Sequence, residues 1–256
     1  MLAELVGGAV ADADARAAEL PLDAVIAAAA DAPPALDALR ALAPADRVKV
    51  IAEVKRASPS RGRLADIPDP AALASLYEAG GASAISVLTE QRRFLGSLDD
   101  LRAVRAAVGI PVLRKDFIAQ PYQVYEARAA GADIVLLIVA ALDQPTLESL
   151  HALTLSLGMT ALVETHSADE VARAVDAGAA LIGVNARNLD TFELDRDLFG
   201  TLADRIPTGV IRVAESAVLG PDDVAHYRAS GADVVLVGEA LVTSDPTARL
   251  AEFLSV

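Results

Sequence analysis

Short runs of apolar, often β-branched residues recur along the chain at a nearly constant spacing. They end about 22 to 34 residues apart, the length that one strand and one helix require together. The eight runs cover residues 48–55, 84–89, 110–116, 133–140, 159–165, 181–187, 210–216 and 233–239. Each run is continuously apolar rather than alternating, which is typical of parallel strands covered by helices.

A small-residue motif supports this count. GGAS (80–83), AGAD (130–133), AGAA (177–180) and SGAD (230–233) each close a segment of helical period and lead into an even-numbered run. We expect the glycine to end the helix in the left-handed region. The repeat unit is then βαβα taken four times, which predicts an α/β protein with a closed (β/α)8 barrel, the TIM-barrel fold. A doubly wound open sheet is the alternative, but no Gly-x-Gly-x-x-Gly turn follows the first run.

The barrel accounts for most of the chain. The whole chain has 256 residues, which matches the usual size of such a fold. Residues 1–47 precede the first run and read as alanine-rich helix followed by a proline-containing connection. We therefore expect residues 1–256 to form a single domain, in which 1–47 is a helical extension packed on a barrel of residues 48–256.

Composition excludes several classes of function. The net charge of -14 argues against a nucleic-acid partner, because phosphate backbones require a basic surface. The longest apolar run, Ile134 to Leu142, lies between Asp133 and Asp143 and is too short to span a membrane. The chain has no cysteine and its first residues carry no basic segment, so we expect a cytoplasmic protein without disulfides.

Charged and polar side chains stand at the carboxyl ends of the predicted strands, where barrels of this kind build their active sites. They are Glu53, Lys55, Lys115, Glu164, Asn185, Arg187, Glu215 and Ser216. Glu53, Lys115, Glu164 and Glu215 come from odd-numbered strands, so we expect them in one interior layer. Unequal surroundings should separate their pKa values and leave one proton donor and one acceptor near neutrality.

The role of Lys115 is open at this point. In an apolar mouth a lysine loses affinity for its proton and can act as a general acid, or it can form a Schiff base with a carbonyl. No metal cluster is predicted, because His151, His166 and His226 lack the spacing of ligands. We interpret these histidines as surface or packing residues.

The ends of the last two predicted strands indicate an anion site. Ser216, Ala217, Gly238 and Glu239 follow these strands. Barrels often hold a phosphate there on backbone N–H groups, and Gly238 would let the backbone approach it closely.

Several strand-end motifs together carry a family resemblance. They are IAEVKRASPSRG, SVLTEQRRFLGS, PVLRKDF, GADIVLLIVA, LVETH, IGVNARNL, VAES and LVGEAL. In this order they resemble the indole-3-glycerol phosphate synthase family of tryptophan biosynthesis, over residues 48–245. TEQRRFLGSLDDL and VLRKDF are similar to its actinobacterial branch.

The resemblance implies an enzyme that closes an anthranilate-bearing ribulose phosphate into an indole, with loss of carbon dioxide and water. It implies a phosphorylated small-molecule substrate, no cofactor and no metal. We favour a monomer. A related phosphate-binding barrel such as phosphoribosylanthranilate isomerase, or a non-catalytic paralogue, remains the alternative.

The resemblance also assigns roles to residues. Lys115 is the general acid of ring closure, Glu164 is its acid/base partner, and Lys55 is a candidate acid for the dehydration. Glu53 and Asn185 orient the substrate, and Glu215 completes the polar layer. The remaining positions bind substrate: Ser58, Phe94 and Arg187 at the anthranilate end, and Ser216, Ala217, Gly238 and Glu239 at the phosphate.

One position departs from the family pattern. The family reads AESG where this chain has AESA, so Ala217 replaces a glycine. Alanine keeps the N–H donor, but it is strained if the position requires a positive φ.

Overall fold

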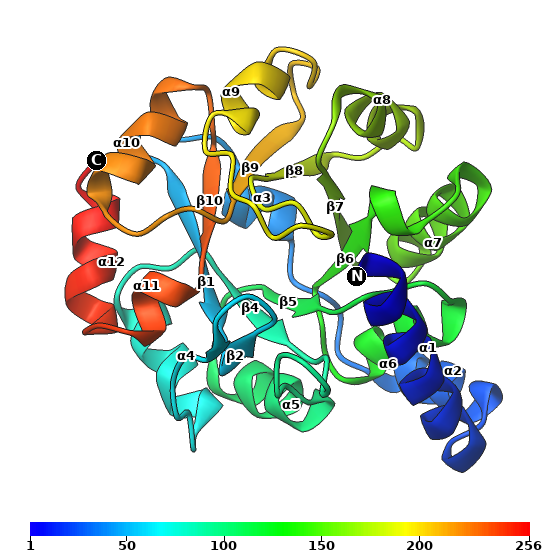
Figure 1. Cartoon of the computed structure of the whole chain (residues 1–256). Coiled ribbons are helices and arrows are strands. Elements are labelled where there is room, and N and C mark those ends of the chain that lie inside the picture. The colour runs from blue at the N-terminus through cyan, green and yellow to red at the C-terminus, as the bar shows by residue number, and fades with distance from the viewer.

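Eight parallel strands close into a barrel in this computed structural model, which describes all residues from Met1 to Val256. The barrel order is β1-β10-β9-β8-β7-β6-β5-β4, and Figure 1 looks into its mouth. The barrel strands are β1 (Lys49–Val54), β4 (Ala84–Leu88), β5 (Val112–Lys115), β6 (Ile134–Ile138), β7 (Thr160–Thr165), β8 (Leu181–Asn185), β9 (Ile211–Glu215) and β10 (Val234–Val237). The predicted TIM barrel is thus confirmed, with each strand inside its predicted run.

Helices cover the outside of the barrel. They are α4 (Pro70–Ala79), α5 (Leu98–Ala107), α6 (Pro121–Ala129), α7 (Gln144–Ser156), α8 (Ala168–Asp176), α9 (Leu198–Ala203), α10 (Pro221–Ala229), α11 (Glu239–Val242) and α12 (Pro246–Leu254), with a short 3-10 turn, η1 (Val139–Ala141). Side-chain oxygens of Asp69, Ser97 and Ser167 accept backbone N–H groups at the helix starts. At the opposite ends, one glycine of each predicted motif has a φ between 80° and 96°, as expected: Gly81, Gly131, Gly178 and Gly231.

The apolar core has two parts. A cluster of 49 buried residues fills the space between strands and helices. A second cluster of 18 fills the barrel interior and includes Ile51, Leu113 and Leu162. No helix combines the length and the apolar character needed to cross a membrane.

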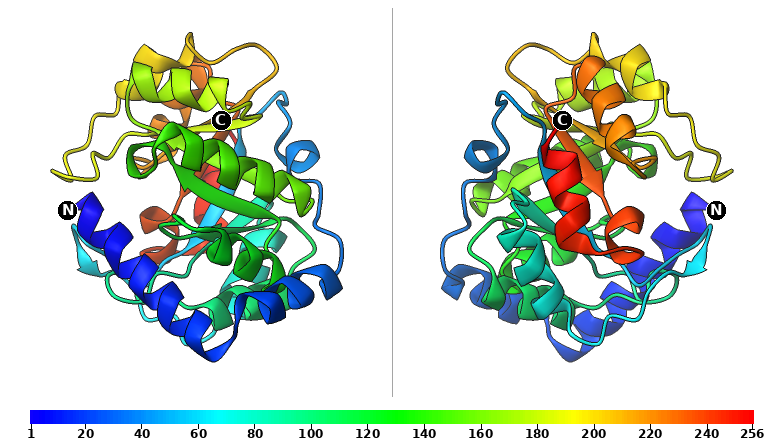
Figure 2. Two further views of the ribbon diagram at one scale, coloured as in Figure 1. Left: turned by 90° about the vertical axis from the view of Figure 1, so that its right-hand side faces the viewer. Right: turned by 90° about the vertical axis from the view of Figure 1, so that its left-hand side faces the viewer.

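The N-terminal extension contacts both ends of the barrel. It contains α1 (Leu2–Glu19), α2 (Leu22–Asp31) and α3 (Ala38–Leu42). Leu5 of α1 and Leu42 of α3 belong to the same interior cluster, although the two helices lie at opposite ends of the barrel in Figure 2. The backbone N–H of Leu2 also donates to Asp190 at 3.2 Å, in the loop after β8. We propose on these contacts that extension and barrel form one domain.

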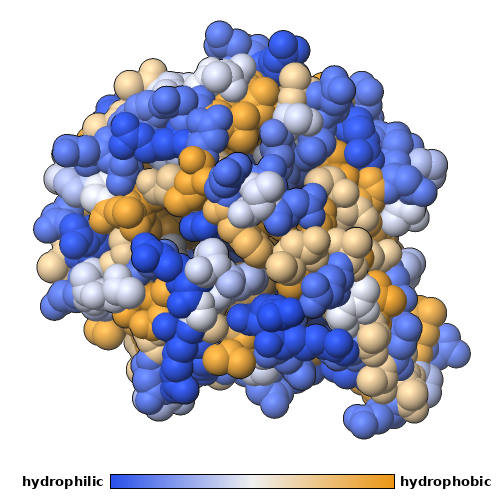
Figure 3. All heavy atoms as spheres, viewed as in Figure 1, coloured by the Kyte–Doolittle hydropathy of each residue, from blue (hydrophilic) through white to orange (hydrophobic).

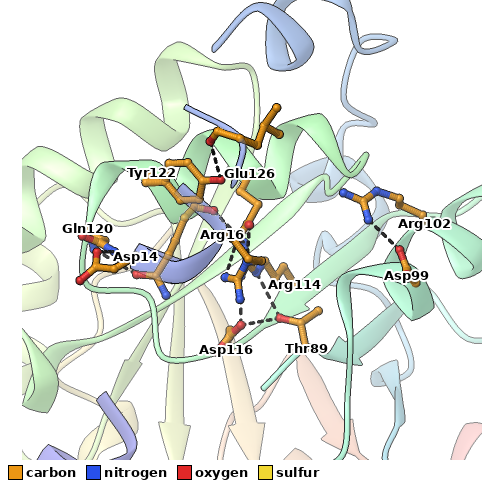
Figure 4. A network of polar contacts seen from close by, with 12 residues as sticks. Asp14, Arg16, Thr89, Asp99, Arg102, Arg114, Asp116, Gln120, Tyr122 and Glu126 are labelled. Carbon is orange, nitrogen blue, oxygen red and sulfur yellow. Dashed lines mark hydrogen bonds and ion pairs between the residues drawn. The ribbon is translucent and has the colours of Figure 1, made fainter. Parts of the chain in front are cut away.

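A buried ion network ties α1 to the segment after β5 (Figure 4). Arg114 is fully buried, and its guanidinium lies 3.0 Å from Asp116 and 2.9 Å from Glu126. It also donates to the hydroxyl of Thr89 at 3.1 Å. Glu126 in turn accepts from Arg16 of α1 at 2.5 and 2.9 Å. Because Asp116 follows Lys115 directly, this network fixes the end of β5 that carries the lysine.

Breaking this network should cost far more free energy of unfolding than breaking an exposed ion pair. Replacing one partner of a buried ion pair leaves the others unpaired and costs about 3–5 kcal/mol. We therefore expect Arg114→Met to lower the free energy of unfolding by that amount in urea titrations followed by circular dichroism. Arg102→Met is the control, since Arg102 pairs with Asp99 on the surface and such pairs contribute less than about 1 kcal/mol. Equal small losses in both variants would contradict the assignment.

Candidate active site

Four charged side chains meet inside the mouth of the barrel. Glu53, Lys115, Glu164 and Glu215 stand at the carboxyl ends of β1, β5, β7 and β9, which are alternate strands of the barrel. The three carboxylates are at most 1% exposed. Such burial requires compensation by charge or hydrogen bonds. The shared layer predicted from the strand order is therefore present.

Lys115 is the centre of this layer. Its Nζ lies 3.2 Å from Oε2 of Glu53 and 3.4 Å from Oε2 of Glu215. Glu53 also lies 3.4 Å from Nζ of Lys55 and accepts a hydrogen bond from Ser86 at 3.2 Å. Burial alone would raise the pKa of Glu53, but Lys115 and Lys55 outweigh it and hold that pKa below its usual value. Glu53 is thus an ionised bridge between two ammonium groups.

The protonation of Lys115 differs from the expectation for an apolar mouth. Burial acts to lower the pKa of Lys115, but the charges of Glu53, Glu215 and Glu164 outweigh burial and raise this pKa above the ordinary lysine value. The expected loss of proton affinity was wrong because three carboxylates surround the ammonium. The amine therefore stays charged, whereas Schiff-base formation needs a neutral amine.

Glu164 and Glu215 have opposite protonation. Burial would raise the pKa of Glu164, but His166 and Lys115 outweigh it and lower this pKa to about 2. Burial and the nearby charge of Glu164 raise the pKa of Glu215 to about 8. At neutral pH Glu215 therefore carries a proton and Glu164 does not. The expected separation of pKa values is present.

Two glycines make room for the buried carboxylates. A Cβ at position 183 would lie 2.1 Å from Oε1 of Glu215, and one at position 238 would lie 2.6 Å from Oε1 of Glu53. We expected glycine at position 238 so that the backbone could approach a phosphate. The structure shows a second reason, because a side chain there would collide with the Glu53 carboxylate. No side chain larger than hydrogen fits at either site without displacing the charged layer.

A cavity opens above the charged layer (Figure 3), where hydrophilic and hydrophobic residues both border the hollow. One end is apolar and includes Phe94 and Phe117, whose ring centroids are 6.2 Å apart. Leu5 of α1 reaches this end. The cavity brings together the predicted residues Glu53, Lys55, Ser58, Phe94, Lys115, Glu164, Asn185, Arg187, Ser216 and Glu239.

A second, more polar hollow adjoins the first. The predicted residues that line it are Glu53, Lys55, Lys115, Arg187, Ser216, Ala217, Gly238 and Glu239. Ser216 and Ala217 both have positive φ, 69° and 55°, so the expectation of a strained alanine is met. The hydroxyl of Ser216 donates to Oδ1 of Asn185 at 2.8 Å, which joins this hollow to the charged layer.

A short hairpin overhangs the polar hollow. Strands β2 (Ala57–Ser58) and β3 (Gly62–Arg63) form it, and its Arg61 lies 2.6 Å from the carboxylate of Glu239. The Glu239 side chain therefore pairs with Arg61 and leaves the backbone N–H groups after β10 free of its carboxylate.

Sequence reasoning missed three features of the site. His166 was interpreted as a surface or packing residue, but its Nε2 lies 3.3 Å from Oε1 of Glu164. Ser86 and Phe117 were not singled out either. For His166 a signal existed, since residues two apart in a strand face the same side and LVETH places histidine two after glutamate. No group of three potential metal ligands is present, and His151 and His226 lie outside both hollows.

Comparison with known proteins gives a consistent result. The family model described as indole-3-glycerol phosphate synthase matches residues 2–253. An indole-3-glycerol phosphate synthase of Leifsonia xyli subsp. xyli is 72% identical over 256 residues, covering 100% of this chain and 98% of the relative. One of Mycolicibacterium gilvum is 62% identical, covering 100% and 94%.

Solved structures of low sequence identity share the fold. The 3-hexulose-6-phosphate synthase of Salmonella typhimurium superposes with a TM-score of 0.66 at 18% identity, over 81% of this chain and 97% of the other. A thiamine phosphate pyrophosphorylase of Pyrococcus furiosus gives 0.60 at 16%, over 80% and 93%. These similarities support the barrel, whereas the family model and the close relatives carry the assignment. This chain belongs to the indole-3-glycerol phosphate synthase family.

Proposed function

We propose that this chain is a carboxy-lyase that converts 1-(2-carboxyphenylamino)-1-deoxyribulose 5-phosphate into indole-3-glycerol phosphate. One observation carries the proposal: the Lys115 ammonium faces both the apolar cavity and the adjoining polar hollow. A substrate with an aromatic ring at one end and a phosphate at the other would place its carbonyl between them. Action as a cytoplasmic monomer stays a prediction.

The two hollows suit the two ends of this substrate. Phe94 and Phe117 offer apolar surface to the anthranilate ring, with Ser58 and Arg187 at its rim. In the polar hollow, the backbone N–H groups at Ala217 and Glu239 and the cations Lys55 and Arg61 suit a phosphate. The phosphate would compete with Glu239 for Arg61.

Ring closure then needs one proton donor near the carbonyl. The ring carbon that bears the carboxylate attacks the ribulose carbonyl carbon, and Lys115 protonates the carbonyl oxygen as the new bond forms. The carboxylate leaves as carbon dioxide, and its bonding electrons restore the aromatic ring. Glu53 and Asn185 hold the reacting groups in place, and Glu215 supports Lys115 at 3.4 Å.

Dehydration needs an acid and a base. The hydroxyl formed from the carbonyl leaves as water after it receives a proton, and a proton is removed from the adjacent carbon to complete the indole. We assign the base to Glu164, whose lowered pKa keeps it ionised. Lys55 is our candidate acid for this step.

A direct assay tests the activity. Adding the ribulose phosphate substrate to purified protein should produce indole fluorescence together with one carbon dioxide per indole. Substrate consumption without carbon dioxide would point to another barrel enzyme, and binding without consumption would point to a non-catalytic paralogue.

The role of Lys115 predicts the result of its removal. We expect Lys115→Met to lower kcat by at least about 10²-fold, the usual scale of general acid catalysis, and to change KM less. Lys49→Met is the matched control, because Lys49 is the first residue of β1, at the end opposite the mouth. Near-normal turnover in a folded Lys115→Met variant would remove this lysine from the mechanism.

The strained Ala217 predicts a gain in affinity. Its φ of 55° is one that glycine adopts without penalty, so Ala217→Gly should lower KM by up to about tenfold, equivalent to roughly 1.4 kcal/mol. We expect kcat to change little, because phosphate binding contributes equally to ground and transition states.

The control for Ala217 relieves a positive φ at a position outside both hollows. Leu95 also has positive φ, 57°, and lines neither hollow, so Leu95→Gly should leave KM unchanged. The measurement pairs KM with the dissociation constant of inorganic phosphate. If both constants stay equal or rise in Ala217→Gly, the loop already accommodates alanine.

A further inference from the structure

His166 forms a link between the charged layer and a carboxylate outside it. It follows β7 directly, and its Nε2 lies 3.3 Å from Oε1 of Glu164. On the other side of the ring, Nδ1 lies 3.2 Å from Oε2 of Glu170, which also accepts the backbone N–H of His166 at 2.8 Å. Glu170 thus fixes the position of the ring, and the side chain is only 13% exposed.

His166 does not line either hollow of the substrate site. It faces a third one, between the loop after β7 and the segment after β8. From that position, the ring reaches the charged layer through Glu164.

We propose that His166 is a positioning residue that carries a proton and holds Glu164 ionised, so that the proton of the neighbouring carboxyl pair resides on Glu215. This inference rests on the base role proposed for Glu164. It adds a residue that determines which of the two carboxyl groups is ionised and can accept a proton from the substrate.

The placement of the charges leaves Glu164 without an ammonium partner of its own. Glu53, Glu164 and Glu215 are buried, and Lys115 and Lys55 supply only two positive charges. Both ammonium groups lie within 3.4 Å of Glu53, and neither forms an ion pair with Glu164. Two adjacent buried carboxyl groups rarely ionise together, because their negative charges repel each other. The group with the stronger cationic partner ionises, and the other keeps its proton. His166 provides that partner for Glu164.

The charged groups that contact the ring or line its hollow are carboxylates, which favour the protonated ring. Glu164 comes from β7, Glu170 from α8, and Glu193 and Asp195 from the segment after β8 that lines the same hollow. Burial would lower the pKa of His166, but Glu164 and Glu170 outweigh burial and raise it to about 10. The ring therefore stays charged across the physiological range.

Removal of the charge should be visible in the pH dependence. Without His166, the pKa of Glu164 rises, so a higher pH is needed to ionise the base. In His166→Gln the acidic limb of the kcat profile should move to higher pH by at least about one unit, with KM changed less than about threefold. His226→Gln is the matched control, because His226 lies 3.2 Å from Asp197 in a pair outside the site.

Nitrogen NMR of the histidine rings tests the same claim without turnover. The chain has 3 histidines, so the two variants assign the spectrum. We expect both ring nitrogens of His166 to stay protonated beyond pH 8 in the unmodified protein. A neutral His166 ring at pH 7 would overturn the proposal, and so would an unchanged acidic limb in folded His166→Gln.

If His166→Gln does not fold, Glu170→Gln decides. It should lower the pKa of His166 and move the acidic limb upward by a smaller amount, and no change in either would overturn the proposal. Absence of indole formation by the unmodified protein would refute the proposed function instead, since the ring titration is measured independently.

Discussion

The ion pair between Lys115 and Glu53 is the interaction on which the site depends. Three buried carboxyl groups converge at the mouth, and their negative charge is tolerable only around a cation. Lys115 supplies that cation from β5, and Glu53 shares its charge with Lys55 at 3.4 Å. Gly183 and Gly238 exist in this arrangement because the carboxylates occupy the space of a Cβ. The layer is therefore preorganised for proton transfer by charge and shape together.

The rest of the fold supports the position of this lysine. Arg114 precedes Lys115 on β5 and points outward into a buried network with Asp116 and Glu126, so the strand end is held on both faces. Arg16 extends the network to α1, and Leu5 of the same helix completes the apolar cavity. The N-terminal extension is thus joined to the site by an ion network and by direct contact.

Periodicity was sufficient to predict the fold, because each βα unit repeats the same apolar pattern and the same glycine at the helix end. Alternation of strands likewise predicted that Glu53, Lys115, Glu164 and Glu215 would meet. What periodicity does not contain is the distance between side chains from different strands. For this reason the direction predicted for the pKa shift of Lys115 was wrong, and the sequence did not reveal the partners of His166 and Arg114. Gly238 shows the same limit, since its constraint is a carboxylate on the neighbouring β1.

The protonation of Lys115 in the unliganded protein is the most direct test of this account. The chain contains only Lys49, Lys55 and Lys115, so carbon NMR of lysine labelled at Cε resolves each titration. Lys115 should remain charged beyond pH 10.4, the ordinary lysine value, and should titrate at lower pH in Glu53→Gln. Titration of Lys115 below about pH 9 in the unmodified protein would contradict a site organised around a buried ammonium.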